Sequence, residues 1–299
     1  ALARAAMPRA LSPAAPQQLV KRIFPYGSGP GQLGMSRPEG STPAGPESFT
    51  LAPDGRILIA DLVNHRVLIC QADGTVAQTI DFPGIRLNDV IADDRGNIIV
   101  YDQRTQTLHH ADTSGRIISS LALPPASVDT RGYFHLAQGS VFFADAALRD
   151  VLVADFRDGT LSEPQPGAER IADGIHAESG RIFSVLAARG ESLRLAARES
   201  RSGETSFERT LPLPDILSAR YSGEDRQGRC YVALERLVAG RVVLEVRTFD
   251  PAGEQLSALQ LPQNDYFIWT SRLVEASRDG IIVQFLPSES QASLGLLRP

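Results

Sequence analysis

The sequence predicts an all-β protein, a six-bladed β-propeller with four antiparallel strands in each blade. Three observations lead to this fold class: glycine turns recur along the chain, a strand-like run follows each turn, and a second glycine turn follows in the same unit. The 299 residues are 42% hydrophobic and 22% charged, so the chain can bury a large core. All-β chains of this length often form one domain.

The first turn of each unit places a glycine after a polar residue. These glycines, separated by 41, 43, 41, 48 and 52 residues, are Gly55, Gly96, Gly139, Gly180, Gly228 and Gly280. The runs that follow them are RILIAD, NIIVYD, SVFFAD, RIFSVL, RCYVAL and IIVQFL. Tight hairpin turns need positive φ, and β-branched and aromatic residues favour strands. The pattern therefore predicts six repeated hairpins.

A second glycine turn predicts the other half of each blade. It follows the first by 19 to 25 residues in five units, at Gly74, Gly115, Gly159, Gly203 and Gly253. Two hairpin turns per unit give four antiparallel strands, here called a to d, which is the blade of a propeller. The sixth unit reaches Pro299 before a second turn. We expect Leu19–Phe24 to supply its outer strand, because an open edge would otherwise remain.

Residues 1–18 are rich in Ala and Pro and have no strand pattern. We expect a disordered tether there, followed by a single propeller domain over residues 19–299. The tether and a first residue other than Met lead us to expect an extracytoplasmic protein, periplasmic or at the cell surface, which the tether could hold at a membrane. No apolar run has the length of a membrane-spanning helix. The net charge of −5 argues against a nucleic-acid partner.

The segment Pro46–Val76 resembles an NHL repeat. It reads PESFTLAPDGRILIADLVNHRVLICQADGTV, with a Pro-Asp-Gly turn, a strand ending in Ala-Asp and then Asn64-His65-Arg66. LNDVIADDRGNIIVYD is a weaker second copy, and GSGPGQLG is similar to the run before a first NHL unit. The resemblance covers roughly residues 19–123. It implies the six-bladed propeller and no particular function.

We expect a ligand or protein partner to bind the face of the propeller at which strand a of each blade begins. The candidate residues enter strand a or lie between strands b and c, and they are Glu47, Asp61, Asn88, Asp102, Arg131, Asp145, Asp173, Arg220 and Arg272. They form a mixed acidic and arginine rim. No G-x-S-x-G motif, P-loop or other complete catalytic set accompanies them. The sequence therefore favours a non-enzymatic binding scaffold without a cofactor.

The alternative is a calcium-dependent lactonase or esterase. Leu87-Asn88-Asp89-Val90 and Asp173-Gly174-Ile175 are similar to strand entries of the regucalcin and gluconolactonase type of propeller. The resemblance implies a calcium ion held by Glu47, Asn88 and Asp173, acting as a Lewis acid on a lactone carbonyl. The Glu-Gly-Pro-x-Trp motif of that family is absent, and Arg131-Gly132 stands where its second Asn is expected.

Histidines and cysteines offer two further possibilities. His135 and His176 fall on the inner strands of neighbouring blades, near the channel. They either line the channel as polar side chains or hold a transition metal, although a catalytic zinc usually has three protein ligands. Cys70 and Cys230 fall in blades 1 and 5, with blade 6 between them, so we expect two buried free thiols.

Overall fold

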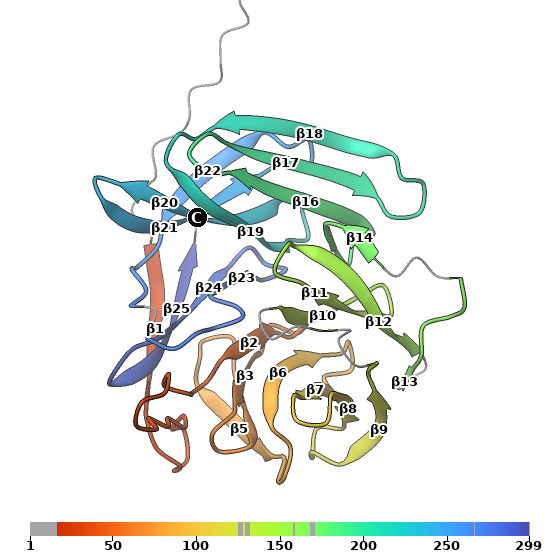
Figure 1. Ribbon diagram of the computed structural model, residues 1–299, viewed down its shortest axis with the longest axis vertical. Helices are drawn as coiled ribbons and strands as arrows, with labels where there is room; N and C mark the ends of the chain where they lie inside the picture. Colours follow the sequence, from red (N-terminus) through yellow and green to blue (C-terminus); the bar gives the residue numbers. More distant parts are fainter. Residues whose placement is uncertain are drawn as a thin grey trace, which may run out of the picture.

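The computed structural model describes residues 17–124, 128, 132–157, 159–167, 171–265 and 267–298. These residues form six antiparallel sheets, arranged as blades around a central channel (Figure 1). The described part of the chain contains no α-helix, and so no helix there is long and apolar enough to cross a membrane. The prediction of a six-bladed β-propeller is confirmed.

Each blade runs from an inner strand at the channel to an outer strand. Blades 1 and 2 comprise β2 (Ser48–Leu51), β3 (Ile57–Asp61), β4 (Arg66–Cys70) and β5 (Val76–Asp81), then β6 (Leu87–Ala92), β7 (Ile98–Asp102), β8 (Thr107–Ala111) and β9 (Ile117–Ala122). Blades 3 and 4 comprise β10 (Tyr133–Ala137), β11 (Ser140–Ala144), β12 (Arg149–Arg157) and β13 (Thr160–Ser162), then β15 (Ile175–His176), β16 (Arg181–Ala188), β17 (Ser192–Glu199) and β18 (Thr205–Pro212). Blades 5 and 6 comprise β19 (Ile216–Glu224), β20 (Cys230–Val238), β21 (Arg241–Phe249) and β22 (Gln255–Gln260), then β23 (Val274–Ala276), β24 (Ile282–Pro287), β25 (Gln291–Arg298) and β1 (Gln17–Pro25).

The last blade is closed by the first strand of the chain. β1 pairs antiparallel with β25, and Phe24 lies opposite Ala292 (Figure 1). Phe24 is buried, whereas the preceding Ile23 is exposed on the other face, as the alternation of a strand requires. The predicted role of Leu19–Phe24 is confirmed. β1 starts at Gln17, inside the segment expected to be a tether, and residues 1–16 lie outside the described residues.

The repeated turns have a common physical basis. In blade 2, Oδ1 of Asp93 accepts hydrogen bonds from the backbone N–H groups of Arg95 and Asn97, both at 2.8 Å. Gly96 has φ +80°, a conformation that costs glycine little because it has no Cβ. An aspartate that caps the turn, followed three residues later by a left-handed glycine, thus forms the hairpin locally.

The core lies between blades rather than within a single one. All residues of β3, β4 and β7 are buried. Leu58 and Val67 of blade 1 pack in one cluster with Val90 and Val100 of blade 2. Strands in the middle of a blade bury both faces, which explains their continuous apolar runs.

The NHL-like element of blade 1 anchors the loop that follows β1. Arg66 donates to the buried carboxylate of Asp61 at 3.0 Å and to the carbonyl of Gln32 at 2.8 Å. The side-chain amide of Asn64 donates to the carbonyl of Gly27 at 2.9 Å. These contacts give the Asn-His-Arg element a structural role.

Blades 3 and 4 depart from the expected regularity. A short strand, β14 (Ile171–Asp173), pairs with β12 of blade 3, and the inner strand of blade 4 is only β15. Gly174 separates the two with φ +116°, and a Cβ there would lie 2.7 Å from the carbonyl oxygen of Phe183. The chain therefore turns at Gly174 from one blade to the next.

Both cysteines are buried and free, as predicted. Burial raises the pKa of the Cys70 thiol to about 12, with a smaller contribution from Asp73. Burial also raises the pKa of Cys230 to about 12, although Arg181 opposes it. Neither thiol is a thiolate nucleophile at neutral pH.

Candidate functional site

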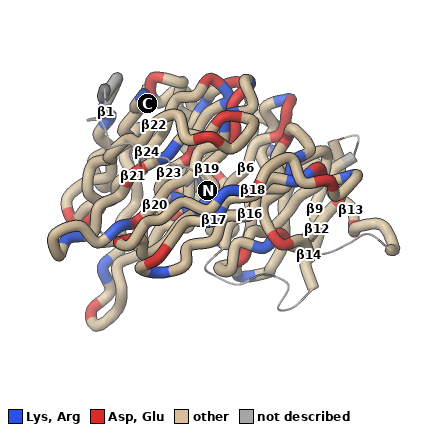
Figure 2. Tube along the Cα trace, turned by 90° about the horizontal axis from the view of Figure 1, so that it is seen from above, with Lys and Arg blue, Asp and Glu red and all other residues tan. Residues whose placement is uncertain are grey.

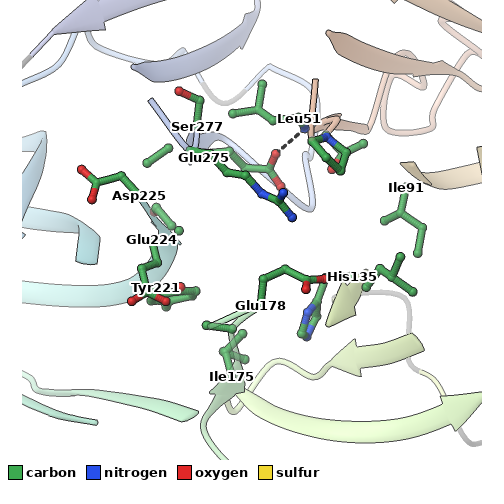
Figure 3. Close-up of a pocket in the computed structure, with 18 of the residues that line it drawn as sticks. Leu51, Ile91, His135, Ile175, Glu178, Tyr221, Glu224, Asp225, Glu275 and Ser277 are labelled. Carbon is green, nitrogen blue, oxygen red and sulfur yellow. Dashed lines mark hydrogen bonds between the residues drawn. The ribbon is translucent and has the colours of Figure 1, made fainter. Parts of the chain in front are cut away.

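A cavity of about 760 Å³ occupies the central channel, and residues of all six blades line it (Figure 3). Its walls are the inner strands, among them β6, β19 and β23. Its mouth lies where the inner strands end, because the turns to the second strands contribute Pro53, Asp94, Ser179, Arg226 and Arg278. The pocket therefore opens on the face opposite the one at which strand a begins.

Arg272 closes the other end of the channel. Its side chain is 3% exposed and crosses from blade 6 to three other blades. Its guanidinium donates to the carbonyl of Phe49 at 3.2 Å, to the carbonyl of Phe134, and to Asp89 at 3.4 Å. It also donates to Glu275 in its own blade at 2.9 Å. These contacts join blades 1, 2, 3 and 6 and form the floor of the pocket.

Tyr133 and Arg220 complete the floor. The guanidinium carbons of Arg272 and Arg220 lie 4.8 and 5.5 Å from the centre of the Tyr133 ring, within the range of cation–π attraction. Arg220 also donates to the carbonyl of Ser271. Burial raises the pKa of Tyr133 to about 12, against the opposing effect of Arg220, so its phenol stays protonated at neutral pH.

A buried carboxylate joins the two pocket histidines. Oδ1 of Asp150 lies 2.9 Å from Nε2 of His135, and Oδ2 lies 2.9 Å from Nδ1 of His176. The Phe142 ring stacks on both imidazoles, with centroid distances of 5.6 and 4.2 Å. Burial pushes the pKa of Asp150 upward, but the charge of His135 and the hydrogen bonds from both histidines outweigh it and lower the pKa to about 2.

The first of the two expectations for His135 and His176, polar side chains that line the channel, agrees with this arrangement. The residues that the structure describes contain no group of three His, Cys, Asp or Glu side chains that could hold a metal ion. The two imidazoles share a carboxylate, and both line the pocket. Asp150 holds one nitrogen of each ring and leaves the second nitrogen of each as a polar group for the pocket.

The acidic residues of the inner wall already have partners. Glu275 accepts from Arg272 and from the backbone N–H of Leu51 at 2.8 Å (Figure 3). Burial raises the pKa of Glu275, and Arg272 counteracts part of that rise. Glu224 pairs with Arg181. Asp225 is buried and accepts from Arg229 at 2.6 Å.

Charges of both signs surround the mouth. Arg226 pairs with Asp279 at 2.7 Å, and Arg278 lies 3.7 Å from Asp94. Partial desolvation at the pocket wall raises the pKa of Glu178, and the neighbouring Asp94 raises it further. Basic and acidic residues are interspersed over the part of the chain that the structure describes (Figure 2). The mouth therefore favours polar ligands without selecting one sign of charge.

Of the nine rim residues expected from the sequence, Arg220 and Arg272 line the pocket. Glu47 and Asn88 lie together, with the Asn88 amide 3.1 Å from Oε2 of Glu47. Burial raises the pKa of Glu47, and Arg86 counteracts it. Asp173 is exposed on β14, where it lies opposite Arg149 of β12 in the sheet of blade 3. The structure thus joins two of the three ligands that the calcium alternative needs.

The other aspartates of the rim stabilise turns. Asp61 is buried against Arg66. Asp102 accepts from the backbone N–H of Arg104 at 3.0 Å and the hydroxyl of Thr105 at 2.8 Å. Asp145 accepts from the backbone N–H groups of Ala147 and Arg149 at 2.8 and 3.0 Å. Arg131 lies outside the described residues.

Sequence reasoning missed Asp150 and Glu275. A signal for Asp150 was present, because it directly precedes the apolar run VLVA of a third strand. A charged residue in a buried strand needs a partner. The histidines of the neighbouring inner strands are the partners that the structure supplies.

No protein-family model matches the sequence, and no curated protein matches it. Solved structures share the fold. The chain is 11% identical to the hydrazine synthase of Kuenenia stuttgartiensis over 83% of this chain and 76% of that one, with a TM-score of 0.50. It is 12% identical to a member of the DUF4221 family from Bacteroides vulgatus over 95% and 97%, with a TM-score of 0.51. At these identities, the likeness shows the propeller fold alone.

Proposed function

We propose that the protein is a binding module whose central pocket holds a small polar ligand. One observation carries the proposal: the channel is blocked at one end by Arg272 and open at the other, which leaves a blind pocket of about 760 Å³. Small-molecule sites in proteins are concave, span about 300–1,000 Å³, and combine apolar walls with a few polar groups. Ile91, Ile175 and Tyr221 supply such walls here.

A plugged variant tests this proposal. Glu178 lies exposed on the pocket wall near its mouth (Figure 3), so Glu178→Trp should obstruct entry without disturbing the core. The matched control is Glu204→Trp, an exposed position outside the pocket lining. A collection of small polar metabolites would be screened by thermal unfolding against the wild type and both variants.

A ligand present at 100 times its dissociation constant adds about 2.7 kcal/mol to the free energy of unfolding. For a chain of 299 residues, that gain corresponds to a rise in Tm of about 4 °C. We expect compounds that raise the Tm of the wild type and the control but not of the plugged variant. Mass spectrometry should recover them unchanged. A compound that is converted at the pocket would show an enzyme, and a screen in which every stabilising compound acts equally on the plugged variant would reject the pocket.

We also propose that the opposite face contacts a protein partner and that the protein works outside the cytoplasm. The exposed carboxylate of Asp173 supports the first point, and the Ala/Pro-rich composition of residues 1–18 supports the second. A partner at that face should lose affinity for Asp173→Arg and keep it for Glu178→Trp. Cell fractionation tests the location.

A further inference from the structure

Some polar groups that line the pocket have no hydrogen-bond partner among the described residues. Arg220 is half-buried there, and no carboxylate of the described residues lies within ion-pair distance of it; its one hydrogen bond to a described residue goes to the carbonyl of Ser271. Nε of Arg272 and Oγ of Ser222 are buried without a hydrogen-bond partner among the described residues. Buried polar groups in this state are rare, and each calls for an explanation.

The neighbouring carboxylates of Glu275 and Asp89 accept hydrogen bonds from other groups and none from Arg220. Glu275 accepts from Arg272 through Oε1 and from the N–H of Leu51 through Oε2. Asp89 accepts from the N–H of Val90 through Oδ1, and from the N–H of Phe134 and Arg272 through Oδ2. Arg220 therefore has no carboxylate acceptor among the described residues.

A ligand can supply the missing acceptor. We propose that the pocket binds an organic monocarboxylate, whose carboxylate pairs with Arg220 beside the Tyr133 ring and whose apolar body packs against Ile91, Ile175 and Tyr221. Guanidinium and carboxylate groups match in shape and form charge-assisted hydrogen bonds. This inference rests on the proposed binding function and adds the class of ligand.

The charge of the floor favours one negative charge over two. Asp89 and Glu275 both pair with the guanidinium of Arg272. Arg220 is therefore the cation of the floor that is available to pair with a ligand. A phosphate dianion would bring a second charge toward two existing carboxylates, and repulsion between like charges grows in a site shielded from water. Free phosphate should therefore bind more weakly than a carboxylate.

Matched pairs of acids and amides test the inference. The probes are phenylacetate, indole-3-acetate and hexanoate, each compared with its primary amide by titration calorimetry, with inorganic phosphate as a further probe. The variants are Arg220→Gln, which keeps a donor but removes the charge, and Arg220→Lys, which restores the charge. Arg209→Gln is the control outside the pocket lining, where Arg209 already pairs with Glu254.

In the wild type, we expect the affinity of each acid that binds to exceed the affinity of its amide by about tenfold or more. Hydrogen bonds to charged groups are stronger than those between neutral groups. Arg220→Gln should abolish this preference, Arg220→Lys should restore part of it, and Arg209→Gln should keep it. Thermal unfolding shows that each variant is folded.

Three results would overturn the proposal. Amides that bind as tightly as acids, or an acid preference that survives Arg220→Gln, would reject the carboxylate while leaving the binding pocket intact. Phosphate that binds more tightly than every carboxylate would reject the monoanion. If no probe binds in a way that Glu178→Trp blocks, the carboxylate inference fails, and the binding function is then judged by the metabolite screen alone.

Discussion

Among the residues of the central channel, Arg272 should contribute most to the stability of the fold. The substitution Arg272→Met tests this. Methionine approximates the length of the arginine stem but removes the charge and all donors. The substitution leaves two carboxylates, Asp89 at 2% exposure and Glu275, without their guanidinium. It also removes the donors to the carbonyls of Phe49 and Phe134. Breaking a buried ion pair by removing one partner costs about 3–5 kcal/mol, which is a loss in Tm of about 5–8 °C for a chain of this length.

The loss of stability caused by Arg272→Met should be smaller at pH 5 than at pH 7.5. Burial alone raises the pKa of Glu275, and Arg272 counteracts that rise, so the pKa of Glu275 in folded Arg272→Met should lie further above its value in the unfolded chain. A group with a raised folded pKa makes the folded state bind more protons, so stability increases as pH falls toward about 4.5. The gap between wild type and variant should therefore narrow from pH 7.5 to pH 5.

Urea unfolding, followed by circular dichroism at both pH values, measures this gap. Arg278→Met is the matched control, because Arg278 is 41% exposed and lies 3.7 Å from Asp94. Exposed pairs of this kind contribute at most about 1 kcal/mol. A loss for Arg272→Met as small as that of the control, or a loss equal at both pH values, would refute the idea that Arg272 neutralises buried carboxylates.

Three further predictions concern other parts of the ring. Asp150→Asn should lower the free energy of unfolding by about 2 kcal/mol at pH 7, because the lowered pKa of Asp150 stabilises the folded state above about pH 4. Unfolding measured at decreasing pH should show the difference from wild type vanish between about pH 4 and pH 2. Phe24→Ala should cost about 3–5 kcal/mol in urea unfolding, against less than about 0.5 for the exposed Ile23→Ala; equal losses would argue against closure by β1. Cys70 and Cys230 should resist a thiol reagent at pH 8 in the native protein and react in denaturant.

The blades could be predicted from the sequence because their turns are local. Asp93 and Gly96 form a hairpin through contacts within five residues, and the same chemistry recurs along the chain. Counting these turns also exposed the missing outer strand of blade 6 and so predicted its partner in Leu19–Phe24. The closure of a ring by its two ends follows from topology alone.

The position of the pocket could not be predicted in this way. Arg272 blocks the channel through contacts with Phe49, Asp89 and Phe134, which stand 223, 183 and 138 residues away in the chain. No local pattern shows that an arginine entering an inner strand will cross the channel rather than project from its rim. Glu47 and Asn88 could be placed at adjacent strand entries from the sequence. Asp173 could not, because the turn at Gly174 leaves it in a strand that pairs with blade 3.

The blind channel separates the groups that hold the ring together from those that a ligand meets first. Arg272 and Asp89 join blades and are buried, so a change at either should affect stability and binding together. Asp94, Glu178 and Arg278 lie at the mouth, on or beside turns whose backbone is set by other residues. Substitutions there should alter the choice of ligand at little cost in stability.

Arg220 stands between the two groups, because it contacts the floor yet has no carboxylate partner among the described residues. It is therefore the position at which a conservative change should affect binding most while leaving the ring intact.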